Sequence, residues 1–133
     1  MSWAPEAIDL PDVLAEVTAC FHAYEAAFMQ NDLPALIGFF WEDERLTRYG
    51  VVDRQLGHAE QAAYRHSVPK PGFTRQLENL RIHCFGPDMA VALVEFLRSD
   101  TALRGFQSQT WARLPEGWRI VSAHVSMIPW PPT

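Results

Sequence analysis

The sequence predicts a single α+β domain in which a curved antiparallel sheet wraps around helices from the first half of the chain. Before residue 45, apolar residues recur at spacings of three and four, which is typical of helices. After residue 74, apolar runs alternate with turns rich in Pro and Gly, which is typical of strands. Helices and strands segregated in this way indicate α+β rather than alternating α/β architecture. The length of 133 residues suits one domain, with its core expected at 10–128, a leader at 1–9 and a Pro-rich tail at 129–133.

Three helices are predicted in the first half of the chain. The first runs from about residue 11 to 30, because six apolar side chains form one stripe: Leu10, Leu14, Val17, Phe21, Tyr24 and Phe28. Asp9 or Asp12 is placed to cap its start. A second, shorter stripe predicts a helix over about 33–41, and a third short helix is expected over about 58–66.

Strands account for most of the remaining sequence. Two short β-prone segments flank Gly50, and four longer strands are predicted over 75–85, 89–98, 105–114 and 118–128. The strand over 89–98 is apolar almost throughout, so we expect it at the centre of the sheet. In the last strand, simple alternation places five side chains on one face: Trp118, Ile120, Ser122, His124 and Ser126.

Composition excludes several classes of protein. The formal net charge of −5 argues against a general nucleic-acid binder, and no apolar run reaches the roughly 20 residues of a membrane span. Cys20 and Cys84 form no CxxC pair, and residues 1–10 lack the pattern of a secretion signal, so we expect reduced thiols and a cytoplasmic protein. No nucleotide-binding or metalloprotease motif is present, and no two histidines are four residues apart. We therefore expect neither a cofactor nor a metal.

Two residues would be costly to bury without a hydrogen-bonding or ionic partner. Tyr24 lies in the apolar stripe of the first helix, where its hydroxyl is either satisfied within the core or directed into a pocket as a substrate anchor or proton donor. Arg48 lies in a short β-prone segment, where it is either a solvent-facing edge residue or a buried cation. A buried guanidinium must be paired, and a substrate carboxylate would be a suitable partner.

Further polar residues occur in the predicted sheet. Gln107 and Gln109 share one face of their strand, as a polar outer face or as the lining of a pocket. His124 and Ser126 could line a cavity, although a lone histidine is more often structural. Glu95 ends an apolar run and is expected in a structural ion pair with an arginine, such as Arg48 or Arg98.

Several stretches of the chain resemble one branch of the nuclear transport factor 2-like superfamily, the AtzH-like and HpxZ-type proteins of ureido-acid catabolism. The resemblance covers roughly residues 12–128 and is carried by these stretches: Tyr24-Glu25, Asn31-Asp32, Phe40-Trp41, Thr47-Arg48-Tyr49-Gly50, Phe85-Gly86, Gln107-Ser108-Gln109-Thr110-Trp111 and Ala123-His124-Val125-Ser126.

The resemblance implies a cone-shaped, cystatin-like fold, usually dimeric, with a pocket between the first helix and the concave sheet. In the AtzH-like branch it implies a decarboxylating amidohydrolase that converts a dicarboxylated urea into allophanate, whereas HpxZ-type members are linked to oxalurate breakdown. The family's tyrosine on the first helix and its arginine in the RYG motif fall on Tyr24 and Arg48.

These observations lead to one hypothesis and two alternatives. The hypothesis is a cofactor-free enzyme, a homodimer or higher homo-oligomer, acting on a small anionic ureido acid. Arg48 would bind a carboxylate, and Tyr24 would orient the substrate or donate a proton. Its candidate lining residues are Gln107, Gln109, His124 and Ser126. The first alternative is a non-catalytic module of the same fold that binds a small molecule or a protein. The second is an isomerase or cyclase, which would need His124 or Glu95 as its base.

Overall fold

The computed structural model describes residues 2–131. The chain order of its elements is η1 Pro5–Ala7, α1 Pro11–Gln30, α2 Leu33–Gly38, β1 Thr47–Tyr49, β2 Arg54–Leu56, α3 His58–Ser67, β3 Arg75–Cys84, β4 Met89–Arg98, β5 Arg104–Leu114 and β6 Gly117–Ile128. The predicted helices and strands are all present, with ends that differ by a few residues. The architecture is α+β, with one curved sheet packed against helices from the first half of the chain, as the sequence predicted.

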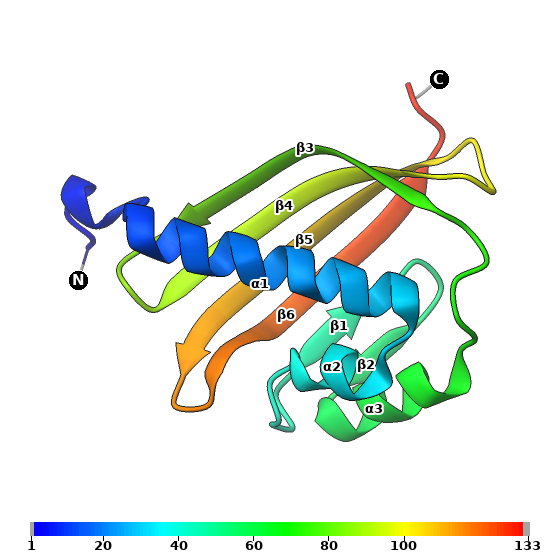
Figure 1. Cartoon of the computed structure of the whole chain (residues 1–133), viewed down its shortest axis with the longest axis horizontal. Coiled ribbons are helices and arrows are strands. Elements are labelled where there is room, and N and C mark those ends of the chain that lie inside the picture. The colour runs from blue at the N-terminus through cyan, green and yellow to red at the C-terminus, as the bar shows by residue number, and fades with distance from the viewer. Residues whose placement is uncertain (1, 132–133) are drawn as a thin grey trace.

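The sheet is mixed rather than purely antiparallel. Its six strands follow the order β2-β1-β6-β5-β4-β3, and β3 to β6 form an antiparallel meander. β1 pairs in parallel with β6, which the sequence did not predict. A parallel pair needs a long connection between its strands, and α3 with the rest of the meander supplies it. Figure 1 shows α1 lying across one face of the curved sheet, with α2 and α3 beside β1 and β2.

The core lies between α1 and the inner face of the sheet. The predicted stripe of α1 is buried there, with Val17 and Phe21 fully inaccessible and Tyr24 only 5% exposed. On the sheet side, Trp111 and Ile120 are also inaccessible. Burying side chains of this size stabilises the fold by about 1.5–3 kcal/mol each. The packing of α1 therefore determines which face of the sheet is concave.

The start of α1 differs from the prediction. Leu10 occupies the N-cap position, and neither predicted aspartate caps the helix with its side chain. The Asp9 carboxylate instead accepts a hydrogen bond from the backbone N–H of Cys84 (3.0 Å) and lies 3.0 Å from His83 Nδ1. Asp9 thus ties the leader to the end of β3. Cys84 and Cys20 are both free thiols, as predicted.

β6 contains a bulge that reverses its alternation. The register pairs Thr110 with Ser122 but Trp111 with Ile120, so Val121 is an additional residue on β6. Before the bulge the inner face carries Trp118 and Ile120; beyond it, the residues that pair with inward-facing Gln109, Gln107 and Gly105 are Ala123, Val125 and Met127. The predicted common face for residues 118–126 is therefore wrong from Ser122 onward.

The close contact between Gly105 and Phe96 offers a test of how side chains pack on the sheet. Gly105 pairs with Phe96 on β4, and a methyl group at Gly105 would overlap the Phe96 ring. We expect Gly105→Ala to lower the free energy of unfolding by about 1–3 kcal/mol, because Phe96 is buried and cannot move without strain. Denaturant unfolding monitored by circular dichroism measures the change.

Gly38→Ala is the matched control, because no heavy atom lies within 4 Å of a methyl group added there. This variant is expected to be neutral or stabilising by up to about 1 kcal/mol. Equal stability of the two variants would contradict the proposed packing of Phe96 over Gly105.

Candidate active site

A cavity of about 460 Å³ opens between α1, α3, the β1–β2 hairpin and the meander. Its wall combines aromatic rings with cationic side chains. Among the lining residues are Tyr24 and Phe28 of α1, Arg48 of β1, Tyr64 and Arg65 of α3, Arg75 of β3, Phe96 of β4, Gln107 of β5, and Val125 and Met127 of β6. The two residues that the sequence singled out, Tyr24 and Arg48, thus line the same cavity.

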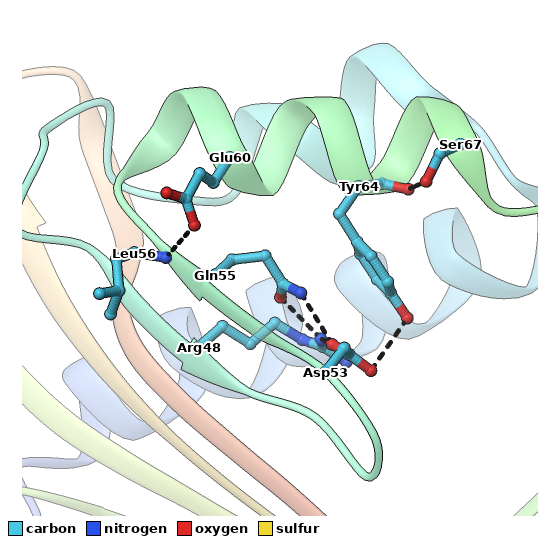
Figure 2. A network of polar contacts seen from close by, with 7 residues as sticks. All are labelled: Arg48, Asp53, Gln55, Leu56, Glu60, Tyr64 and Ser67. Carbon is cyan, nitrogen blue, oxygen red and sulfur yellow. Dashed lines mark hydrogen bonds and ion pairs between the residues drawn. The ribbon is translucent and has the colours of Figure 1, made fainter.

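Arg48 is a buried cation with a protein partner. It is 8% exposed, and its Nη1 donates to Asp53 Oδ1 (2.8 Å) and to Gln55 Oε1 (2.9 Å). Figure 2 shows this network between β1, the hairpin and α3. The expectation that a buried Arg48 must be paired is correct, but Asp53 is a partner that the sequence did not reveal. Arg48 Nε and Nη2 make no hydrogen bond to residues 2–131, so one edge of the guanidinium is available to a ligand.

Asp53 is the acceptor that organises the hairpin. In addition to Arg48, its carboxylate accepts hydrogen bonds from Gln55 Nε2 (2.8 Å) and from the Tyr64 hydroxyl (3.4 Å). Partial burial would raise the pKa of Asp53, but the hydrogen bond from Gln55 and the charge and hydrogen bond of Arg48 together hold it below the ordinary value. A side chain at Gly50 would collide with this carboxylate, which gives a physical reason for glycine after Arg48-Tyr49.

Tyr24 combines a buried ring with an uncommitted hydroxyl. Its ring packs edge-to-face against Phe39 and Phe40, with centroids 6.2 and 6.0 Å away. The hydroxyl makes no hydrogen bond within residues 2–131, although the side chain is only 5% exposed and lines the cavity. A core tyrosine normally satisfies its hydroxyl within the protein. Of the two interpretations of Tyr24, the arrangement therefore favours the one in which its hydroxyl is directed into a pocket and is available to a ligand.

Arg65 is a cavity residue that sequence reasoning missed. It is 3% exposed, and its guanidinium lies 5.5–5.7 Å from the ring centroids of Phe28, Phe40 and Tyr64. Its Nε and Nη2 are buried without a hydrogen-bond acceptor in the described part of the chain. Burial lowers the pKa of Arg65, and the neighbouring Arg48 charge acts in the same direction. α3 has a polar sequence, so no apolar stripe indicated that this residue faces inward.

A second buried ion pair lies on the sheet side of the cavity. Arg75 Nε is 3.1 Å from Glu25 Oε2, although the N–H is not aligned for a hydrogen bond, and its guanidinium stacks on Phe96 at 4.0 Å. Burial raises the pKa of Glu25, which Arg75 only partly offsets, and burial lowers the pKa of Arg75. Burial of these two charges therefore costs solvation free energy.

Gln107 is oriented by this pair. Arg75 Nη2 donates to Gln107 Oε1 at 3.2 Å. Because arginine can only donate, the amide oxygen of Gln107 must face Arg75 and its Nε2 must face away. That Nε2 is buried without a hydrogen-bond acceptor among residues 2–131, and Gln107 lines the cavity. Gln107 therefore keeps one amide donor that no described residue satisfies.

The other predicted lining residues lie elsewhere. Gln109 is buried but accepts from Trp111 Nε1 (3.0 Å) and does not line the cavity. The prediction that His124 and Ser126 line the cavity is wrong, because the bulge at Val121 turns both side chains to the outer face of the sheet. There the His124 ring packs against the half-exposed ring of Tyr49, whose centroid is 5.8 Å away.

Glu95 is in a structural ion pair, as expected, but with an arginine that the sequence did not indicate. Arg104 Nε donates to Glu95 Oε1 (2.7 Å), and Asn79 donates to Oε2 (3.1 Å). Glu95 is not among the residues that line the cavity, and neither is His124. The cavity therefore lacks both residues that an isomerase or cyclase would have used as its base.

The sequence profile of the AtzH-like family matches residues 6–130. The chain belongs to the AtzH-like family. The resemblance carried by Tyr24, Arg48 and the residues around them is thereby confirmed. A search of curated proteins gave no significant match.

Solved structures agree with this assignment. The chain is 45% identical to a protein of unknown function from the DUF3225 family of Pectobacterium atrosepticum, with a TM-score of 0.93 over 96% of this chain and 99% of the other. It is 40% identical to a cystatin-like fold protein of Burkholderia xenovorans, with a TM-score of 0.90 over 93% and 98%. A nuclear transport factor 2-like protein of Salmonella enterica, 24% identical with a TM-score of 0.73 over 92% and 95%, shares the fold.

Two features are absent from residues 2–131. None of the helices described has the length and apolar character to cross a membrane. Nor does the same part of the chain bring together three or more His, Cys, Asp or Glu side chains that could hold a metal ion.

The pairing of Asp53 with Arg48 gives a pH-dependent contribution to stability. Because the folded pKa of Asp53 lies below the ordinary 3.8, the ion pair stabilises the fold above that pH and loses its effect as the pH falls through the folded value. We expect Asp53→Asn to lower the melting temperature at pH 7, and the difference from wild type to shrink between pH 5 and about 3. Thermal unfolding at a series of pH values measures both.

Asp12→Asn, at the exposed start of α1, is the matched control for loss of one carboxylate. It is expected to change the melting temperature at pH 7 by much less. A difference between Asp53→Asn and wild type that stayed constant from pH 7 to pH 3 would be inconsistent with this role of Asp53.

Proposed function

We propose that the protein is a cofactor-free enzyme that releases carbon dioxide from a carboxylated urea or a related ureido acid. The observation that carries the proposal is the meeting of two buried side chains, Tyr24 and Arg48, in one cavity. The phenol makes no hydrogen bond within residues 2–131, and the guanidinium has a free edge. Membership of the AtzH-like family supports this reaction class.

The charge of the cavity suits an anionic substrate. Although the chain carries a formal net charge of −5, the lining contains five cationic side chains and two carboxylates: Arg48, Arg65, Lys70, Arg75 and Arg98 against Asp53 and Asp100. Arginine binds carboxylates through paired, charge-assisted hydrogen bonds, which are stronger in a site with little water. The local charge therefore favours a carboxylate over a neutral urea.

The proposed reaction requires one proton and no oxidant or reductant. The bond between the carboxylate carbon and nitrogen breaks, carbon dioxide leaves, and the electron pair stays on the nitrogen. The nitrogen takes a proton from the Tyr24 hydroxyl, which is restored from solvent. Arg48 holds a carboxylate through its free Nε and Nη2 edge, and Gln107 Nε2 donates to the urea carbonyl. The apolar rings that surround the cavity limit hydration of the departing carboxylate.

A panel of ureido acids with one or two carboxylates tests the proposal, with products identified by mass spectrometry and evolved carbon dioxide measured directly. Release of carbon dioxide from a member of the panel would support it. Thermal stabilisation by a ureido acid without any product would instead favour the non-catalytic binding module.

Removal of the Tyr24 hydroxyl gives a sharper test. We expect Tyr24→Phe to lower kcat by about 10²-fold or more, because it deletes the proposed proton donor. Its melting temperature should stay close to that of wild type, since the hydroxyl makes no hydrogen bond within the described residues.

Tyr49→Phe removes a hydroxyl from the outer face and is the matched control, with activity expected to remain at the wild-type level. Comparable rates for Tyr24→Phe and Tyr49→Phe would remove Tyr24 from the mechanism.

We also propose that the protein is a homodimer that uses the outer face of the sheet. Apolar side chains are exposed there, including Met89 (40%), Leu93 (38%) and Ile128 (38%). Exposed apolar groups gathered on one face are typical of subunit contacts. Light scattering during size-exclusion chromatography should give twice the chain mass of 15.1 kDa, and a mass of one chain would contradict the proposal.

A further inference from the structure

Glu25 is a buried carboxylate with little support for its charge. The residue is 9% exposed, and both carboxylate oxygens are shielded from solvent without a hydrogen bond from any of residues 2–131. Arg75 Nε lies 3.1 Å from Oε2, but its N–H is not aligned with the oxygen. Buried carboxylates usually accept hydrogen bonds, which stabilise the ionised form. The charge of Arg75 is therefore the main support of an ionised Glu25.

The same guanidinium also faces the cavity. Arg75 stacks on Phe96 at 4.0 Å, donates through Nη2 to Gln107 (3.2 Å) and lines the cavity wall. Its Nη1 makes no hydrogen bond to any described residue. An anion in the cavity interacts with the charge that supports Glu25, and a site with little water strengthens that interaction. One cation therefore serves two anionic groups, one from the chain and one from the ligand.

We infer that an anion entering the cavity and a proton on Glu25 bind cooperatively, each strengthening the other. The inference rests on the proposed function only in placing an anion in this cavity. With Glu25 ionised, the anion meets a guanidinium that is already neutralised and a carboxylate that repels it. With Glu25 protonated, the positive charge of Arg75 is free to attract the anion. The coupling is reciprocal, because the factor by which the proton raises anion affinity is the factor by which the anion raises proton affinity.

This coupling suits the proposed reaction, which consumes one proton for each carbon dioxide released. Uptake of a proton together with the substrate anion keeps the net charge of the cavity region unchanged as the anion enters. Glu25 does not itself donate to the substrate, because its oxygens have no accessible surface. It acts on the ligand through Arg75, as a positioning residue rather than a catalytic one.

The other charges near Glu25 are few. α1 packs against α2, β3 and β4, and α2 has no titratable side chain. On α1 itself, the exposed His22 acts on Glu25 in the same direction as Arg75. The remaining titratable side chains of β3 and β4 are Glu78 and Glu95, which pair with Arg104; His83, which pairs with Asp9; Arg98, which pairs with Asp100; the exposed Arg81; and the buried thiol of Cys84. A test of the coupling must therefore separate Glu25 from His22.

The sign of the pH dependence follows from the burial of Glu25. Burial raises the pKa of Glu25 above its ordinary 4.5, and a bound anion raises this pKa further. Between these two folded values, Glu25 is ionised in the free protein and protonated in the complex. Anion affinity therefore rises as the pH falls through that interval and is constant on either side of it. Asp53, whose pKa is held below 3.8, stays ionised throughout.

Hydantoate is a suitable probe, because it is a ureido acid whose carboxylate is attached to carbon and is not released by protonation of nitrogen. In calorimetry, we expect wild type to bind hydantoate about 10-fold more tightly at pH 5 than at pH 8. Measurements in buffers of different ionisation enthalpy should show uptake of up to about one proton on binding at intermediate pH. Glu25→Gln imitates the protonated residue, so its affinity should be independent of pH and match that of wild type at pH 5.

Glu16→Gln removes an exposed carboxylate from the same helix and is the matched control, expected to keep the wild-type pH dependence and proton uptake. His22→Gln should keep both as well. Equal affinity of wild type at pH 5 and pH 8, binding without proton uptake, or no binding of hydantoate in this range would overturn the inference. So would loss of the pH dependence in His22→Gln, or its retention in a folded Glu25→Gln.

A second measurement needs no variant at Glu25 and holds even if Glu25→Gln does not fold. Carbon-13 NMR of the side-chain carboxyl groups follows the ionisation of Glu25 directly in the wild-type protein. With hydantoate bound, the Glu25 signal should titrate at a higher pH than in the free protein. Titration at the same pH in both states would overturn the inference.

The result is distinguishable from failure of the proposed function. If hydantoate binding takes up a proton through Glu25 but no ureido acid is turned over, the coupling stands and the enzymatic proposal fails. If a ureido acid is turned over but hydantoate binds without proton uptake, the coupling is wrong and the enzymatic proposal stands.

Discussion

The buried ion pair between Arg48 and Asp53 is the interaction on which the site depends. A buried guanidinium on β1, the strand next to the sheet edge, needs an acceptor, and the β1–β2 hairpin supplies one at 2.8 Å. The same carboxylate accepts hydrogen bonds from Gln55 of β2 and Tyr64 of α3 (Figure 2). One charge therefore connects β1, β2 and α3 around the cavity. Gly50 leaves the space that this carboxylate occupies. The pair therefore shapes the hairpin while leaving one edge of Arg48 free.

Three buried arginines in one wall show different solutions to the same electrostatic problem. Arg48 and Arg75 are balanced by carboxylates from the chain, and Arg75 is further stacked on Phe96. Arg65 lies near three aromatic rings and makes no ion pair with any described residue. The cavity is thus strongly cationic inside a protein whose net charge is negative.

The two faces of the sheet carry different side chains because β6 contains a bulge. One additional residue at Val121 is enough to move Ser122, His124 and Ser126 outward and Val125 and Met127 inward. The inner face can then be apolar where it meets the cavity, while the outer face carries His124 beside Tyr49. The bulge alters neither the family assignment nor the fold, since the strands and their order in the sheet do not depend on it.

The sequence by itself determined the fold class, the limits of most elements and three cavity residues, Tyr24, Arg48 and Gln107. Spacing of apolar residues follows directly from helix and strand geometry, so the stripe of α1 and the meander could be predicted from local pattern. Tyr24 and Arg48 stood out because each would be costly to bury without a partner. Only the tertiary structure revealed Asp53, Arg65 and Arg75 around the same cavity. The hairpin turns Asp53 back onto Arg48, Arg75 pairs with the distant Glu25, and Arg65 has no ion-pair partner among the described residues. The tertiary structure also showed that His124 and Ser126 lie outside the site. A bulge depends on the pairing between strands, so the alternation of residues along one strand cannot predict it.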